Sequence, residues 1–306
     1  MSTNKEHIFV VGASGAIGSG IVRGLVKQGF NTTAYVRDES KAKNLFKDEL
    51  LTECLTIVVG TYASVEVYEK AIEGHTRLFL LAVGDYKRPT RMSEVKETFA
   101  KIAYEKGVRQ IVDLSSFTVR SVGRQGIIGY MHTTSEEKLW KLADERPDER
   151  SLVILRPGVF MSNQLMADIQ SVKHSNKLVS CGSPSSTFAW IDTKDISDCS
   201  VVILTEPVEK HDRCVYEMGA EYLTHEQRAA VFTKVLGRPI TYEQQPAEAL
   251  YKMFIGFGLS HSYAYDLVSF PIESIAGHVT PQLSILIHRP LRTLEEWLQE
   301  NVKAFQ

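Results

Sequence analysis

A glycine-rich stretch near the start of the chain reads Val10-Val11-Gly12-Ala13-Ser14-Gly15-Ala16-Ile17-Gly18. It follows the apolar run 8–11 and leads into a segment, 17–26, whose apolar residues recur with helical spacing. A strand, a glycine turn and a helix in this order predict a phosphate-binding loop, in which free N–H groups at the positive end of the helix hold a pyrophosphate. The alternative is a glycine turn that only connects strand to helix.

The glycines have distinct expected roles. Gly12 permits the tight turn, Gly15 lets a phosphate approach the backbone, and Gly18 allows the helix to pack closely on the strand. Their spacing is G-x-x-G-x-x-G rather than the G-x-G-x-x-G of typical dehydrogenases. The residues expected to contact the cofactor phosphates are Gly12, Ser14, Gly15, Ala16, Ile17 and Gly18.

A basic residue, Arg37, closes the second expected strand. An acidic residue at this place would hold a ribose 2′-OH, whereas an arginine accommodates a 2′-phosphate. A guanidinium makes bidentate contacts to phosphate, and Lys41 can add a second cation. Asp38 could face the ribose, or it could cap a helix that begins at Glu39. We favour the capping role for Asp38 and NADP as the cofactor.

Short apolar runs alternate with helical segments through the first half of the chain. The expected strands are 32–37, 55–59, 78–83, 110–115 and 152–156, and the expected helices are 64–73, 91–106 and 134–145. This alternation predicts an α/β fold, a doubly wound parallel sheet of the Rossmann type with helices on both faces.

The second half of the chain is less regular. We expect short strands at 177–181, 188–191 and 214–218, and helices capped by Thr193, Thr224 and Thr293, the last two with a capping box. We assign residues 1–158 to the Rossmann domain, with 188–218 returning to it. Residues 159–187 and 219–306 then form a smaller, interlocked C-terminal α+β substrate lobe.

Composition limits the class of protein. The 306 residues carry 35 Lys and Arg against 37 Asp and Glu, a net charge of −2, so no nucleic-acid footprint is indicated. Four scattered cysteines without a C-x-x-C pair are typical of reduced thiols, and the histidines show no metal-ligand spacing. No run approaches the ~18 apolar residues of a spanning helix, and the polar start has no secretory h-region. We expect a cytoplasmic monomer or homodimer with a small-molecule substrate and no metal, nucleic-acid or membrane partner.

Several separate motifs resemble one family. The glycine loop, Arg37, Leu114-Ser115-Ser116, the segment 155–163 and the ending around Trp297 are similar to those of the NmrA-like group. That group is an atypical branch of the short-chain dehydrogenase/reductase superfamily, and the resemblance spans nearly the whole chain. It implies NADPH-dependent reduction of quinones, azo dyes or triphenylmethanes, a tailoring step in fungal or microbial secondary metabolism, or non-catalytic NADP sensing.

The chain departs from the Ser, Tyr and Lys set of typical short-chain dehydrogenases. Tyr130 follows Ser116, but Thr134 stands where the Tyr-x-x-x-Lys pattern requires lysine. The resemblance places His132 at the lysine position, in a His-x-x-x-Glu pattern with Glu136. We expect His132, Tyr130 and Ser116 to serve catalysis, with His132 also near the nicotinamide ribose and with a titration range suited to proton transfer. Whether His132 or Tyr130 donates the proton stays open.

Structural roles are the alternatives for these residues. His132 could satisfy backbone groups at a helix start, and Tyr130 could pack with its hydroxyl in water. Glu136 and Glu137 each complete a Thr-x-x-Glu capping box, which we expect to be their main role.

The carboxyl ends of other strands supply the rest of the expected cofactor site. These residues are Ala82, Val83, Gly84, Ser115, Pro157, Gly158 and Val159. Aromatic residues of the C-terminal region could roof an apolar substrate: Tyr251, Phe254, Phe257, Tyr263, Tyr265 and Phe270. Phe160, Met161, Trp190 and Tyr263 are the candidate substrate residues, and a small hydrophobic core is the alternative role.

Three functions fit these patterns. The favoured one is an NADPH-dependent reductase of a bulky, aromatic or polycyclic molecule with a carbonyl, imine, quinone or conjugated C=C. The second is an NADP-binding regulator without turnover, which the missing Tyr-x-x-x-Lys motivates. The third is an enzyme that keeps the cofactor for redox-neutral chemistry such as a cyclisation.

Overall fold

The computed structural model describes residues 6–119, 126–269 and 278–306. The chain forms two compact units. The first comprises residues 1–115, 131–156 and 196–216, and the second comprises residues 116–130, 157–195 and 217–306. The return to the first unit therefore begins at Ile196, later than the residue 188 expected from the sequence.

A seven-stranded sheet organises the first unit, in the order β10-β6-β5-β4-β1-β2-β3. Its strands are β1 (His7–Val11), β2 (Asn31–Val36), β3 (Leu55–Val59), β4 (Arg77–Leu80), β5 (Gln110–Leu114), β6 (Ser151–Pro157) and β10 (Val215–Met218). The pairings from β3 across to β6 are parallel, and the strand order reverses at β1 and β4. The predicted doubly wound Rossmann sheet is confirmed.

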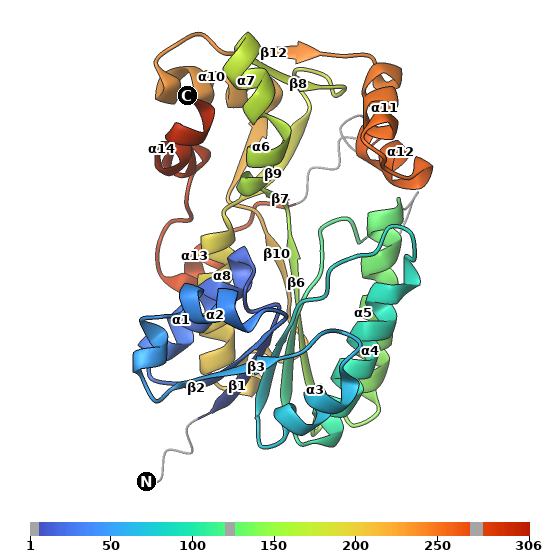
Figure 1. Ribbon diagram of the computed structural model, residues 1–306, viewed down its shortest axis with the longest axis vertical. Helices are drawn as coiled ribbons and strands as arrows, with labels where there is room; N and C mark the ends of the chain where they lie inside the picture. Colours follow the sequence, from blue (N-terminus) through green and yellow to red (C-terminus); the bar gives the residue numbers. More distant parts are fainter. Residues whose placement is uncertain (1–5, 120–125, 270–277) are drawn as a thin grey trace. The chain divides into compact units, whose positions relative to one another are not determined.

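Helices cover both faces of this sheet (Figure 1). One face carries α1 (Ala16–Lys27), α2 (Glu39–Leu45) and α8 (Thr193–Thr205), and the other carries α3 (Val65–Ile72), α4 (Thr90–Glu105) and α5 (Ile127–Asp144). Helix α5 starts seven residues before the expected residue 134 (134 − 127 = 7), because Ile127, Ile128 and Met131 continue its apolar face. The short helices η1 (Glu49–Leu51) and α9 (Val208–His211) complete this part of the chain.

Close packing of α1 on α8 depends on small residues. A Cβ at Gly20 would lie 2.5 Å from Ser197 Oγ, and a Cβ at Gly24 would lie 2.7 Å from a Val201 methyl carbon. The Ser197 hydroxyl donates to the carbonyl of Ile17 at 2.9 Å. Helix α8 therefore supports the first turns of α1, directly behind the glycine loop.

Two small sheets build the second unit, in the orders β11-β9-β7 and β12-β8. Their strands are β7 (Val159–Phe160), β8 (Lys177–Ser180), β9 (Thr187–Ile191), β11 (Glu221–Thr224) and β12 (Thr241–Gln244). The helices are η2 (Met161–Asn163), α6 (Gln164–Ala167), α7 (Ile169–Ser175), α10 (His225–Leu236), α11 (Ala247–Gly256), α12 (His261–Ser269), α13 (Gln282–Ile287) and α14 (Leu294–Phe305). Helices α10 and α14 bury one face against a core that includes Phe232, Trp297 and Phe305.

Two of the three predicted helix caps are confirmed. Thr224 forms a reciprocal capping box at the start of α10, and Thr293 forms another at the start of α14. The expectation for α8 is wrong, because Thr193 is its first helical residue. The carboxylate of Asp192 accepts a hydrogen bond from the Lys194 N–H at 3.0 Å and provides the cap instead.

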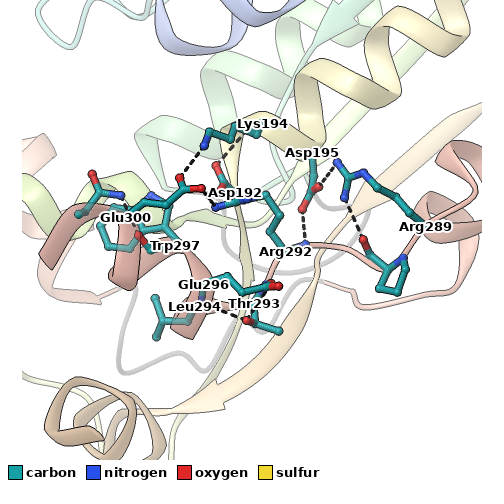
Figure 2. Close-up of polar contacts among 12 residues, drawn as sticks. Asp192, Lys194, Asp195, Arg289, Arg292, Thr293, Leu294, Glu296, Trp297 and Glu300 are labelled. Atoms are coloured by element: carbon teal, nitrogen blue, oxygen red, sulfur yellow. Dashed lines mark hydrogen bonds and ion pairs between the residues drawn. The ribbon is translucent and has the colours of Figure 1, made fainter. Parts of the chain in front are cut away.

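Ion pairs hold the closing segment of the second unit (Figure 2). Arg292 Nε lies 2.6 Å from Asp192 Oδ2, and Arg292 Nη2 lies 2.8 Å from Glu300 Oε1. Asp195 is fully buried; it binds the Arg289 guanidinium at 2.8 Å and the Arg292 N–H at 2.8 Å. Ion pairs of Arg289 and Arg292 therefore hold the segment before α14 in place.

Candidate cofactor and active site

The glycine loop lies between β1 and α1 in the first unit. Gly12 has a φ of +78°, a left-handed conformation that L side chains rarely adopt, and its carbonyl accepts a hydrogen bond from the Gly15 N–H at 3.1 Å. A Cβ at Gly18 would lie 2.2 Å from the Gly12 carbonyl oxygen, so a side chain there would push α1 off the loop. Both positions require glycine for reasons of backbone geometry.

The first turn of α1 is open to an anion. Gly15 is the N-cap residue, no side chain caps the helix, and its first turn holds no acidic residue. Gly15 and Ala16 are exposed, whereas Ile17 and Gly18 are buried. The N–H groups of this turn, at the positive end of the helix dipole, therefore have no acceptor among the described residues.

Two cations lie at the end of β2. Arg37 and Lys41 are exposed, and neither side chain forms an ion pair within the described part of the chain. Asp38 Oδ1 accepts a hydrogen bond from the Lys41 N–H at 2.9 Å and caps α2, which confirms the capping role predicted for it. The carboxylate of Asp38 is therefore already engaged by the helix.

The turn after β4 is fixed by a tyrosine that the sequence did not single out. The Tyr62 hydroxyl accepts a hydrogen bond from the Val83 N–H at 3.1 Å and donates to the Leu81 carbonyl at 3.3 Å. Burial raises the pKa of Tyr62 above its usual value, so the hydroxyl stays protonated. Ala82 is buried in this turn and Val83 is 65% exposed.

Packing inside the protein, and not only a bound ligand, favours glycine at position 84. A Cβ at Gly84 would lie 3.0 Å from the terminal methyl of Met131. Met131 is buried on α5, so the turn after β4 packs directly on the helix that carries His132.

A fully buried ion pair lies at the end of β5. Lys96 Nζ, on α4, lies 2.8 and 2.9 Å from the two carboxylate oxygens of Asp113 and donates to the Leu114 carbonyl at 2.9 Å. Both side chains have no exposed surface. Burial raises the pKa of Asp113, and the ammonium of Lys96 opposes that shift. The sequence analysis missed this ion pair, although a lysine among the apolar residues that α4 buries, Lys96, could have revealed it.

Glu136 forms a second buried group with β5 and β6. Arg156 binds its carboxylate with two hydrogen bonds, Nε at 3.0 Å and Nη2 at 2.6 Å, and the Ser115 hydroxyl donates to the same carboxylate. The capping box expected for Glu136 is wrong, because α5 begins at Ile127 and places Glu136 in its third turn. The box expected for Glu137 is wrong for the same reason.

His132 lies in the second turn of α5 and is half-buried. Burial, reinforced by the nearby ammonium of Lys96, lowers the pKa of His132 to about 3. Its Nδ1 atom is buried and has no hydrogen-bond partner among the described residues. The imidazole is therefore neutral near pH 7, and the titration range expected from the sequence does not apply. A neutral imidazole can donate one hydrogen bond and accept another, but it cannot act as an acid in the way that an imidazolium does.

Ser116 and Tyr130 belong to the second unit. The Ser116 Oγ accepts hydrogen bonds from the N–H and the hydroxyl of Thr118 at 3.2 and 2.9 Å, so it shapes the turn after β5. Tyr130 lies in the first turn of α5 with 43% of its surface exposed. Of the three candidate catalytic residues, Tyr130 is the most exposed, since Ser116 and His132 are half-buried.

The segment Pro157–Val159 also belongs to the second unit. The Pro157 carbonyl accepts from the Phe117 N–H at 3.1 Å, and the Gly158 N–H donates to the Met218 carbonyl at 2.9 Å. A Cβ at Gly158 would lie 2.4 Å from the Ala189 carbonyl oxygen, so strand packing already requires this glycine.

A family model described as "NmrA-like family" matches residues 4–298. The chain belongs to the NmrA-like family.

Known proteins similar to this NmrA-like chain include enzymes and a regulator. An NAD(P)H azoreductase from Xenophilus azovorans is 27% identical over 308 residues, which cover 97% of this chain and 99% of the relative. An NADPH-dependent quinone oxidoreductase from Escherichia coli, solved with NADPH, has a TM-score of 0.80 at 20% identity, covering 96% of this chain and 99% of its own. A negative transcriptional regulator, NmrA, solved with NADP, has a TM-score of 0.75 at 16% identity, covering 99% and 97%.

The substrate residues predicted for this NmrA-like chain divide into two groups. Met161 is fully buried and Trp190 is 5% exposed, and both belong to the core of the second unit. Their assignment to a substrate wall is wrong, because their surfaces are covered by core side chains; the Arg228 guanidinium also lies 4.6 Å from the Trp190 ring centroid. Phe160 and Tyr263 are partly exposed and stay candidates, whereas Phe270 lies outside the described residues.

A cavity of about 610 Å³ does occur in the second unit. Residues of α10 and β12 line it, among them Ala229, Thr233 and Tyr242, and no predicted substrate residue does. Across residues 6–119, 126–269 and 278–306, no cluster of three His, Cys, Asp or Glu side chains could hold a metal ion, and no helix combines the length and apolar character needed to cross a membrane.

Proposed function

We propose that this NmrA-like chain is an NADPH-dependent reductase. The observation that carries the proposal is the anion site of the first unit. It combines a first turn of α1 that no side chain caps with two exposed cations, Arg37 directly after β2 and Lys41 on α2, neither of which forms an ion pair among the described residues. The first feature suits a pyrophosphate and the second suits a ribose 2′-phosphate. The azoreductase relative, which covers almost the whole chain, supports the same cofactor class.

When bound, NADPH supplies the hydride, and the work of the protein is to bind and orient. In this proposal the N–H groups of Ala16, Ile17 and Gly18 hold the pyrophosphate, and Gly15 lets it approach the backbone. Arg37, with Lys41, holds the 2′-phosphate and so favours NADPH over NADH. Asp38 does not compete for the ribose, because its carboxylate caps α2. The turn of Ala82 to Gly84, fixed by Tyr62, forms a further wall.

The proton has a different source from the hydride. His132 is neutral and holds no proton as an imidazolium, so its proposed role is a hydrogen bond to the cofactor ribose or to the substrate. The buried Nδ1 without a partner supports this role, because a bound hydroxyl would satisfy a group that is costly to leave unpaired. We assign the proton to the hydroxyl of Tyr130, a residue that is 43% exposed, or to water.

The proposed substrate is a bulky, aromatic or polycyclic acceptor, such as a quinone or an azo compound. The partly exposed Phe160 and Tyr263 supply aromatic surface for it. The azoreductase relative supports an acceptor of this kind.

A regulator without turnover is the second candidate. Two observations favour it: the neutral imidazole of His132 and the lack of a Tyr-x-x-x-Lys motif. In that case the protein would bind NADP and NADPH alike and would reduce no acceptor.

Calorimetric titration of the protein with NADPH, NADP⁺ and NADH tests the proposal. We expect NADPH to bind more tightly than NADH, and Arg37→Ala to remove that preference. Arg146→Ala is the matched control, because Arg146 is an exposed arginine of the same unit that pairs with Glu149 at 3.3 Å. Mixing the NADPH-loaded protein with quinone and azo acceptors then separates the candidates. Oxidation of NADPH supports the reductase, and tight binding without oxidation of any acceptor supports the regulator.

A further inference from the structure

The first turn of α5 has an unusual cap. The Tyr130 N–H donates to the Gly126 carbonyl at 2.9 Å, which places Gly126 at the N-cap of this helix. Glycine has no side chain with which to accept the free N–H groups of the first turn. A protein acceptor for these N–H groups must therefore come from another residue.

Asp266, on α12, supplies that acceptor. Its Oδ2 atom accepts a hydrogen bond from the Ile128 N–H at 3.2 Å, across 138 residues of sequence. The side chain is 9% exposed. A Cβ at Gly126 would lie 2.1 and 2.2 Å from the two carboxylate oxygens, so only glycine leaves room for this contact. The contact between Asp266 and the first turn of α5 therefore depends on glycine at position 126.

We propose that Asp266 is a positioning residue for Tyr130. The inference rests on the proposed function, in which the Tyr130 hydroxyl faces the substrate. Tyr130 lies two residues beyond the capped amide, in the same turn, so the carboxylate fixes the backbone from which the phenol projects. Tyr263 lies three residues before Asp266 on α12, on the same side of that helix. One carboxylate thus ties a helix that carries candidate substrate surface to the turn that carries the candidate proton donor.

A carboxylate suits this task for two reasons. It accepts a hydrogen bond from an amide that would otherwise have no partner, and its negative charge meets the positive end of the helix dipole. Without it the first turn of α5 frays and Tyr130 loses its fixed direction. The phosphate loop lies in the first unit and Asp266 lies in the second, so we expect NADPH binding to stay unchanged.

The experiment compares Asp266→Ala, Asp266→Asn and Gly126→Ala with the wild type. Thr224→Ala is the matched control, because it removes a side-chain N-cap from α10 of the same unit. Three quantities are measured: hydrogen exchange at the Ile128 amide, the dissociation constant of NADPH, and kcat with a quinone acceptor. Each Asp266 variant is also made in a Tyr130→Phe background.

We expect Asp266→Ala and Gly126→Ala to speed exchange at Ile128 and to lower kcat by about five- to tenfold, the ratio that loss of an N-cap implies. Asp266→Asn should restore most of kcat, because an amide oxygen still caps. Thr224→Ala should leave kcat unchanged. The dissociation constant of NADPH should stay within about twofold of the wild-type value in all variants. The effect of Asp266→Ala on kcat should vanish in the Tyr130→Phe background.

Unchanged exchange at Ile128 in Asp266→Ala would overturn the cap, and an equal loss of kcat with and without Tyr130 would overturn the positioning role. If none of the quinone or azo acceptors causes the wild type to oxidise NADPH, the proposed function has failed. The exchange data then still decide whether Asp266 caps α5.

Discussion

Burial of His132 makes the stability of the protein depend on pH in a calculable way. The folded pKa is about 3, whereas the unfolded chain has the ordinary value of 6.5. Between these two values the unfolded chain binds more protons than the folded one, so protonation favours unfolding and stability falls as the pH falls. Linkage gives a loss of about 2 kcal/mol from His132 alone between about pH 8 and about pH 5.

The perturbation is His132→Gln, which keeps a neutral polar side chain and removes the titration. His225 is also buried, and its pKa of about 4 gives a second contribution of about 2 kcal/mol that remains in the variant. The free energy of unfolding in urea should therefore fall by about 2 kcal/mol less in the variant than in the wild type over this interval. His174→Gln, at an exposed histidine on α7, is the control and should behave like the wild type.

Equal losses of stability in wild type and His132→Gln would refute the reasoning. So would a His132 imidazole resonance that shifts between about pH 8 and about pH 5, because the folded imidazole should stay neutral throughout. Either result would return His132 to the role of general acid that its sequence position suggested.

Three further predictions concern other parts of the chain. Gly18→Ala should weaken NADPH binding measured by calorimetry at least tenfold, ~1.4 kcal/mol, because its Cβ would meet the Gly12 carbonyl at 2.2 Å; unchanged affinity would mean that the loop tolerates movement of α1. Lys96→Met should cost about 3–5 kcal/mol of unfolding free energy by leaving Asp113 charged and buried alone, and adding Asp113→Leu should recover most of that loss. The hydrogen bond from Lys194 is the main cause that lowers the pKa of Glu300. The stability that this ionised carboxylate gives the folded protein is therefore complete above its unfolded pKa and is lost as the pH falls through its folded pKa. Since Glu300 is half-exposed, Glu300→Gln should cost no more than ~1 kcal/mol near pH 7 and nothing in acid; an equal cost at both pH values would contradict the assignment.

Local patterns predicted the first half of the fold well. The strand 55–59 was predicted with its observed ends, and Asp38 and Thr224 cap the helices assigned to them. These features depend on residues a few positions apart, such as an apolar run, a capping side chain or a glycine turn. The glycine loop belongs to the same class.

Contacts between distant residues could not be predicted in this way. Lys96 and Asp113 read as two separate charges, and only the packing of α4 on the sheet brings them together. Glu136 matched a capping box because the start of α5 was placed too late. Met161 was assigned to a substrate wall because an apolar side chain does not reveal whether water, ligand or protein covers it.

The contact between α1 and α8 has a consequence for how variants of this protein are interpreted. Ser197 is 180 residues from Ile17, whose carbonyl in the first turn of α1 it binds, and Gly20 leaves room for it. A larger residue at either place would tilt α1 and move the N–H groups of its first turn. A survey of random variants scored for cofactor affinity should therefore find hits on α8, a helix with no expected contact to the cofactor. Without the structure, such hits would suggest a second binding site where there is only a support.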